Sequence, residues 1–189
     1  MLNTPWGYSV DELPAILSPQ ELRALMPTLS STDDTLAAVL DNVSSAVRDY
    51  CGWHVSPVLE CTYVNNGDGP LLMLPAMGVQ SVESLTVDGD EPAFEWDASG
   101  MVRLKVGEFP EGWRNVTVVY SAGFSSASVA QVVAQIAANM LTAAPGVREE
   151  HAGQVGITYN QTGSGITGGV SVLERDRALL APYRLARAW

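Results

Sequence analysis

Residues that could carry out catalysis are few in this sequence, and none stands in a recognised catalytic pattern. The two histidines, His54 and His151, lie outside any HExxH sequence, which would set two imidazoles and a general base on one helix face. No serine occupies a GxSxG sequence, the turn that exposes the nucleophile of many hydrolases. Cys51 and Cys61 belong to no CxxC or Cys/His metal-binding pattern. The sequence therefore predicts a protein that is not an enzyme and that uses no metal or cofactor.

The composition is that of a globular, acidic protein. The chain has 189 residues, of which 47% are apolar and 16% charged, with a formal net charge of −11. A chain of this length can bury one good core. Binding to nucleic-acid phosphates needs an excess of Lys and Arg, so the negative net charge argues against a protein that binds nucleic acid tightly. The low share of charged residues, against a typical value of about 25%, favours a surface that partners partly cover.

The charge is also unevenly distributed along the chain. Residues 1–97 contain 15 acidic and 2 basic residues, whereas residues 98–189 contain 6 acidic and 8 basic residues. The segment 175–189 alone holds four Arg and one Asp. We expect the two ends of the chain to meet different surroundings.

The N-terminal segment MLNTPWGYSVDELP has neither a basic n-region nor an apolar h-region, so we expect no secretory signal peptide. No apolar run approaches 18 residues, so we expect no membrane span. We expect an irregular arm over the first 17 residues, and synthesis in a reducing cytoplasm with both thiols buried.

Two helix starts precede the part of the sequence that is rich in strands. Ser18, Pro19 and Glu21 form an N-cap, a first-turn proline and a capping-box partner, and Pro27 ends this short helix near residue 26. A second start at residues 32–34 leads into an apolar stripe at helical spacing that ends at Gly52. The sequence predicts a helix over 33–51.

From residue 54 to residue 124 short apolar runs alternate with turn signals, which is typical of antiparallel β structure. We expect strands at 58–64, 71–74, 79–87, 94–96, 101–106 and 116–120. The clusters Asn-Asn-Gly-Asp-Gly (65–69) and Asp-Gly-Asp (88–90) predict turns, and the second is a hairpin signal.

Helical periodicity returns after Ser128, a predicted N-cap, and stops at Pro145-Gly146. Six glycines lie in 151–169, so segment 146–171 is predicted to be an extended glycine-rich arm, with 155–159 its strand-like piece. A last helix over about 172–180 precedes Pro182 and a C-terminal tail, 182–189. The predicted fold class is α+β: a bundle of about four helices with an antiparallel β sandwich or barrel-like insert.

Three pieces in this order resemble the gp6-type head–tail connector (adaptor) proteins of tailed bacteriophages, over about residues 18–187. The first is VRDYCGW (47–53) at a helix end followed directly by strands. The second is the strand 116–120 running through Ser-Ala-Gly-Phe (121–124) into an Ala-rich helix. The third is Val-Arg-Glu-Glu (147–150) through 155–159 to Leu-Leu-Ala-Pro-Tyr-Arg (179–184).

The resemblance implies one connector subunit, with helical frame 18–53, 126–145 and 172–182 and β insert 54–124. It implies a ring, usually of twelve copies, that docks under the portal, extends the DNA channel toward a stopper or other tail-side neck protein, and carries no activity. The location would be the head–tail neck of the virion, after assembly in the host bacterial cytoplasm. DNA would pass through the channel without specific binding, because an acidic lumen repels its backbone.

Two segments are the predicted contact sites. The C-terminal tail lies outside the predicted core, and large apolar and Arg side chains there are the kind that dominate interfaces. Connector proteins also use such segments to reach the portal, so we expect portal binding by Pro182, Tyr183, Arg184, Arg187 and Trp189. The glycine-rich arm is expected to be mobile in the free subunit and to order against a neighbouring subunit through Ile157 and Tyr159.

Two other classes of protein remain open from the sequence. A stopper or tail-completion protein of the same kind of particle would also be rich in strands, but most stoppers are small barrels without helices on both sides. A small hydrolase or ligand-binding domain with an unrecognised pocket is the third hypothesis. A thermal-shift screen with metals and metabolites would detect ligand binding by such a domain.

Overall fold

The computed structural model describes residues 1–142, 149–152, 155–158 and 172–185. The fold is α+β, with four α-helices and antiparallel sheets among the described residues, as the sequence predicts. The chain forms two compact units. The helical unit comprises Ala15–Tyr50 and Ala127–Pro182, and the β unit comprises Met1–Pro14, Cys51–Ser126 and Tyr183–Trp189.

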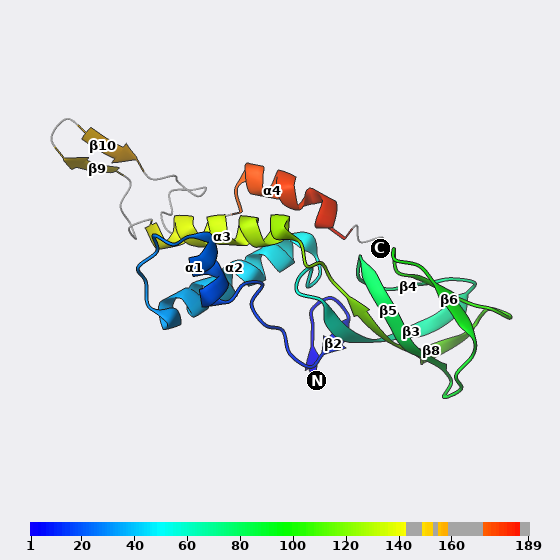
Figure 1. Ribbon diagram of the computed structural model, residues 1–189. Coiled ribbons are helices and arrows are strands. Elements are labelled where there is room, and N and C mark those ends of the chain that lie inside the picture. The colour runs from blue at the N-terminus through cyan, green and yellow to red at the C-terminus, as the bar shows by residue number, and fades with distance from the viewer. Residues whose placement is uncertain (143–148, 153–154, 159–171, 186–189) are drawn as a thin grey trace. The chain divides into compact units, whose positions relative to one another are not determined.

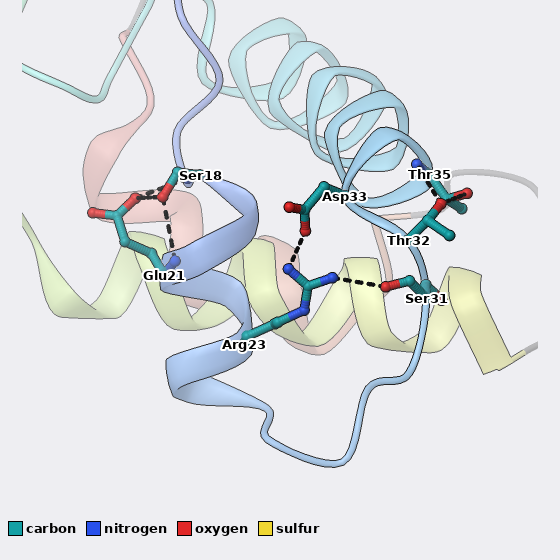
Figure 2. Close-up of polar contacts among 7 residues, drawn as sticks. All are labelled: Ser18, Glu21, Arg23, Ser31, Thr32, Asp33 and Thr35. Carbon is teal, nitrogen blue, oxygen red and sulfur yellow. Dashed lines mark hydrogen bonds and ion pairs between the residues drawn. The ribbon is translucent and has the colours of Figure 1, made fainter.

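Helix α1 (Pro19–Leu25) has the capping box that its sequence predicts. The Ser18 hydroxyl accepts a hydrogen bond from the Glu21 backbone N–H at 3.2 Å, and the Ser18 backbone N–H donates to the Glu21 carboxylate at 2.8 Å (Figure 2). These bonds lower the pKa of Glu21. Arg23 then ties α1 to the next helix through Asp33 and the Ser31 carbonyl. The short helix is therefore fixed at both ends by local polar contacts.

Helix α2 (Asp33–Cys51) matches the predicted range 33–51. Its buried stripe has the helical spacing seen in the sequence and consists of Leu36, Val39, Leu40, Val43 and Val47. Gly52 follows with φ of 78°, a left-handed conformation that glycine adopts without the steric penalty of a Cβ. The long middle segment of the β unit, Cys51–Ser126, begins at this helix end.

Helices α3 (Ala127–Thr142) and α4 (Glu174–Leu180) lie side by side in the helical unit (Figure 1). Helix α3 begins one residue before the predicted N-cap, so Ser128 is in its first turn and that prediction was wrong. Helix α4 continues into a 3₁₀ turn, Ala181–Tyr183, so Pro182 lies within a helical turn and does not end the element. A proline is compatible with that position because its fixed φ suits the first turn of a helix.

The main sheet of the β unit has five antiparallel strands in the order β1-β2-β3-β8-β5. Their bounds are Leu2–Asn3, Tyr8–Val10, Leu59–Gly69, Phe109–Ala122 and Val79–Val87. The prediction of an irregular arm over the first 17 residues was wrong, because Tyr8, Ser9 and Val10 pair with Tyr63, Thr62 and Cys61. Strands this short have too little local pattern to be recognised in a sequence. Here β2 forms by pairing with β3, and β1 forms by pairing with β2.

A second, three-stranded antiparallel sheet has the order β4-β7-β6, formed by Leu72–Met73, Met101–Leu104 and Phe94–Trp96. Leu72 and Val102 are paired and both are buried, so one face of this sheet belongs to the core. Met73 and Met101 are paired on the opposite face and are exposed.

The predicted turn at 65–69 was wrong, because these residues continue β3 against β8 with two register shifts. Opposite them, β8 begins at Phe109 and not at the predicted residue 116. Asn and Gly residues here make an irregular ladder possible: Gly67 and Gly112 have no space for a Cβ, and Asn side chains bond the displaced backbone. This element is the β3–β8 bulge, residues 65–69 and 109–115.

The turn at 88–90 is present, with φ of 53° at Asp88 and 92° at Gly89. The following strand β6 does not pair with β5, however, and the hairpin goes no further than the bridge between Val87 and Asp90. Strand β5 pairs with β8 instead, from Val87 opposite Val116 to Val79 opposite Ala122. The sequence signal at 88–90 therefore forms its turn, but the two strands on either side of the turn do not pair with each other as they would in a hairpin.

Within the described part of the arm, β9 (Glu149–Ala152) and β10 (Val155–Thr158) form a two-stranded antiparallel sheet (Figure 1). Strand β10 falls inside the predicted strand-like piece 155–159. Strand β9 has no apolar alternation in its sequence Glu-Glu-His-Ala, which is why sequence patterning missed it.

Candidate assembly surfaces

The start of the C-terminal tail is docked on the core of the β unit. The Trp53 indole N–H donates to the Tyr183 backbone carbonyl at 2.7 Å, and the Leu185 backbone N–H donates to the Cys51 carbonyl at 2.9 Å. The Tyr183 ring packs edge-on against Phe124, with ring centroids 5.2 Å apart. Its hydroxyl lies 2.9 Å from that of Ser126.

These contacts correct one expectation from the sequence. The tail was expected to lie outside the core. Tyr183 is instead half-buried, and its carbonyl oxygen accepts a hydrogen bond from the fully buried Trp53. Tyrosine suits such a position because its ring can pack on apolar side chains while its hydroxyl forms a hydrogen bond. Tyr183 is therefore a structural anchor that fixes where the tail leaves the β unit.

Other residues of the predicted portal-binding set differ in their placement. Pro182 and Arg184 are exposed on either side of Tyr183. Arg187 and Trp189 lie outside the described residues. Of the two predicted arm contacts, Ile157 is in β10 and pairs through its backbone with Glu150, and Tyr159 lies outside the described residues.

The one histidine in the β unit, His54, is enclosed in a saturated hydrogen-bond network. Its side chain is fully buried; Nδ1 lies 2.7 Å from the Tyr8 hydroxyl and Nε2 lies 2.8 Å from the Ala122 carbonyl. The Tyr8 hydroxyl also accepts from the His54 backbone N–H at 3.1 Å, so its own proton is directed to Nδ1. Since a carbonyl only accepts, Nε2 carries the ring proton. His54 thus joins β2, the α2–β3 connection and the end of β8.

Both cysteines are buried and free of disulfide bonds. Burial raises the pKa of the Cys51 thiol to about 12 and that of the Cys61 thiol to about 12. A thiol that remains protonated at neutral pH is a poor nucleophile and a poor metal ligand. Across the described ranges, no group of three or more His, Cys, Asp or Glu side chains could hold a metal ion.

Sequence reasoning missed one surface residue, Trp113. Its side chain is 82% exposed and projects from the β3–β8 bulge, beside the exposed Arg114. A large aromatic side chain in water is characteristic of a contact site. The signal in the sequence was the Gly-Trp-Arg-Asn run at 112–115, which has turn-forming residues on both sides of the tryptophan.

No helix in the described parts of the chain is both long and apolar enough to cross a membrane. The sequence matches no protein-family model and no curated protein.

Solved structures nevertheless share the fold over nearly the whole chain. One is described as "Neck of empty GTA particle computed with C6 symmetry"; a chain of it aligns with 96% of this chain and 97% of its own length, at a TM-score of 0.61 and 17% identity. A second, "Neck of native GTA particle computed with C12 symmetry", aligns over the same shares at a TM-score of 0.59 and 16% identity.

A third, "Virion of native gene transfer agent (GTA) particle", aligns over the same shares of both chains, at a TM-score of 0.60 and 16% identity. Both the helical unit and the β unit fall within these alignments, since so little of either chain is left out. This chain therefore has the fold of proteins found in gene transfer agent particles, two of them in structures of the neck.

Proposed function

We propose that this protein is a structural head–tail connector (adaptor) subunit, one that forms a ring in the neck of a phage-like particle. The observation that carries the proposal is the end-to-end correspondence of its fold with chains of gene transfer agent necks, 96% of this chain against 97% of the other. A single shared motif would align over a small part of each chain. The gp6-type resemblance of the sequence favours the same role by a separate route.

The proposed ring has twelve copies and encloses a DNA channel. One of the similar neck structures was computed with C12 symmetry and one with C6, and twelve copies satisfy both. The net charge of −11 suits a channel wall, because acidic side chains repel the phosphate backbone and let DNA slide. The ring would join the portal on one side and a stopper or other neck protein on the tail side, in virions assembled in the bacterial cytoplasm.

Two segments are proposed to make specific contacts in that ring. With Tyr183 fixing its exit from the β unit, the tail would reach the portal through Pro182, Arg184, Arg187 and Trp189. The β9–β10 hairpin would lie against a neighbouring subunit through Ile157 and Tyr159. A two-stranded hairpin has little stability in isolation, so an added strand or surface from a neighbour would stabilise it.

The helices favour a connector over a stopper or tail-completion protein. Helices α1 and α2 precede strands β3–β8 in sequence and α3 and α4 follow them, whereas a stopper is expected to be a small barrel without this frame. The buried, hydrogen-bonded His54 and the buried thiols favour a structural role over hydrolysis, since neither group is accessible to a substrate.

The test is assembly on the portal of the same particle. We expect the purified chain mixed with portal rings to give a stacked complex, seen as a ring by negative-stain electron microscopy, and to bind duplex DNA no tighter than micromolar at physiological salt. A chain ending at Leu185 should fold but dock more weakly, because it lacks Arg187 and Trp189. Failure of the full-length chain to join portal rings, or sub-micromolar DNA binding with a steep salt dependence, would contradict the proposal.

A further inference from the structure

A pocket of the β unit, beside the β3–β8 bulge, is lined by side chains that can donate hydrogen bonds. It has a volume of about 240 Å³. Asn3, Ser9 and Thr62 line it from β1, β2 and β3 in one row, because Asn3 is paired with Ser9 and Ser9 with Thr62. Arg114 lines it from β8. We call it the Arg114 pocket, and none of the described residues that line it has a carboxylate side chain.

Three of the side chains in this pocket have donors that no described residue accepts. The Ser9 hydroxyl donates to Asn3 Oδ1 at 2.7 Å, which leaves the Asn3 amide NH₂ without a described partner. The Thr62 hydroxyl has no described partner either. The Arg114 guanidinium forms no hydrogen bond or ion pair with a described residue, and only its backbone N–H is bonded, to Asn66 Oδ1 at 2.8 Å. The pocket therefore brings together three donor groups that need an acceptor.

The backbone at Arg114 is strained. Its φ of 52° is a left-handed conformation that is costly for a residue with a Cβ. The bond to Asn66, together with the bond from the Gly67 backbone N–H to Asn115 Oδ1 at 2.7 Å, holds the bulge in this conformation. Strain that surrounding contacts impose is concentrated at functional sites. An arginine stands here although a glycine would adopt this backbone conformation without the steric cost.

The donors and the charge of the β unit favour a carboxylate as the ligand group. The planar guanidinium matches the two oxygens of a carboxylate, and it also matches a phosphate. The β unit contains 12 acidic and 5 basic residues. A phosphate group carries up to about two negative charges, so this acidic surface repels it more strongly than a carboxylate, which carries one.

The size of the pocket favours a single side chain over a whole small molecule. Its volume of about 240 Å³ is below the value of about 300 Å³ at which pockets for small organic ligands begin. Exposed acidic residues in and next to the bulge, Asp68, Asp88 and Glu111, neither line the pocket nor pair with Arg114. The carboxylate therefore comes from outside the described part of this subunit.

We propose that the Arg114 pocket binds the carboxylate of an aspartate or glutamate side chain from a neighbouring protein chain of the assembly. The guanidinium would donate two parallel hydrogen bonds to the carboxylate oxygens. The Thr62 hydroxyl and the Asn3 amide would donate to their remaining lone pairs. The site itself does not rest on the proposed function, because its affinity for a carboxylate can be measured on the free subunit.

The first experiment titrates the full, ¹⁵N-labelled chain with sodium acetate and follows its amide signals by NMR, with sodium chloride at equal ionic strength as the reference. We expect saturable shifts at Arg114, Thr62 and the Asn3 side-chain amide with acetate alone. Arg114→Gln should weaken acetate binding by roughly tenfold or more, and Thr62→Val by roughly threefold or more. Shifts that do not saturate, or that chloride reproduces, would contradict the proposal.

Arg103→Gln is the matched control. It makes the same chemical change in the same unit, but the Arg103 guanidinium is already engaged by the Glu95 carboxylate at 2.6 Å. Acetate binding should therefore be unchanged in this variant. An equal loss in Arg103→Gln and Arg114→Gln would show that acetate responds to net charge and not to the pocket.

Inorganic phosphate at the same ionic strength tests the class of ligand. We expect phosphate to bind the pocket more weakly than acetate, because the surrounding surface is acidic. Tighter binding of phosphate than of acetate would overturn the assignment to a carboxylate and would indicate a site for a nucleic-acid backbone.

Arg114→Gly tests whether the strained conformation serves binding or folding. The variant should lose acetate binding and should unfold at an equal or higher urea concentration than the wild-type chain, because glycine adopts φ of 52° without the cost of a Cβ. A lower urea midpoint would show that Arg114 is kept for stability, which would remove the strain as an argument for the site.

Assembly identifies the chain that supplies the carboxylate. If Arg114→Gln weakens self-association and Arg103→Gln does not, the carboxylate belongs to a second copy. If Arg114→Gln weakens only the binding to portal rings, it belongs to the portal. Wild-type assembly in both assays would show that no protein carboxylate uses the pocket. A wild-type chain that does neither would overturn the proposed function, while the acetate titration would still decide the pocket.

Discussion

The Trp53 indole N–H and the Tyr183 carbonyl oxygen are 2.7 Å apart, which links the first residues after α2 to the start of the C-terminal tail. Trp53 is fully buried, so its N–H needs this acceptor. A chain ending at Pro182 should therefore lose about 1–3 kcal/mol of stability. Denaturant unfolding measures this, with a chain ending at Leu185 as control because it keeps Tyr183. Equal midpoints for the two truncations would show that the bond contributes nothing.

Replacing Tyr8 with phenylalanine should destabilise the β unit by about 1–3 kcal/mol. The change removes the hydroxyl that serves both His54 Nδ1 and the His54 backbone N–H, and leaves two buried polar groups without it. Tyr63→Phe makes the same chemical change at the residue paired with Tyr8 across the β2–β3 ladder and serves as the control. Urea midpoints that shift equally in both variants would contradict a specific role for the His54 network.

Truncating Leu40 to alanine should cost about 2–5 kcal/mol, the range for a large-to-small change in a packed core. Leu40 lies in the buried stripe of α2 and is fully buried, whereas the next residue, Asp41, is exposed. Asp41→Ala is therefore the control for helix propensity at the same place in the helix. The two free energies of unfolding should differ by more than 2 kcal/mol, and near-equal values would mean that the stripe is not packed.

The two thiols should resist alkylation in the folded chain at pH 8 and react fully in denaturant. Burial raises the pKa of both Cys51 and Cys61 from 9.0 to about 12, so each stays protonated and shielded. Because the folded state holds these protons more tightly than the unfolded state, their contribution to stability is present below pH 9 and falls between about pH 9 and pH 12. Mass spectrometry after iodoacetamide treatment measures the labelling. Rapid labelling of either thiol without denaturant would show that its side chain is accessible.

Helices whose signals lie within their own local sequence could be predicted. Helix α2 needed only an acidic first turn, a stripe of apolar residues at helical spacing and Gly52 after its end, all of which act within the helix itself. The capping box of α1 is likewise contained in Ser18 and Glu21. The order of these pieces also sufficed to predict an α+β fold, which the structure confirms, whereas the connector role that it suggested stays a proposal.

Elements that exist only through distant partners could not be read from the sequence. Residues 8–10 form a strand because they pair with the edge of β3. Residues 65–69 remain in a strand because they pair with the segment of β8 that contains Gly112 and Asn115. Tyr183 resembles a free tail residue until Trp53, 130 positions away, donates to it. Likewise, the exposure of Trp113 and the pocket beside Arg114 depend on which backbones meet, because a hydrogen-bond partner or a neighbouring strand far along the chain leaves no local pattern.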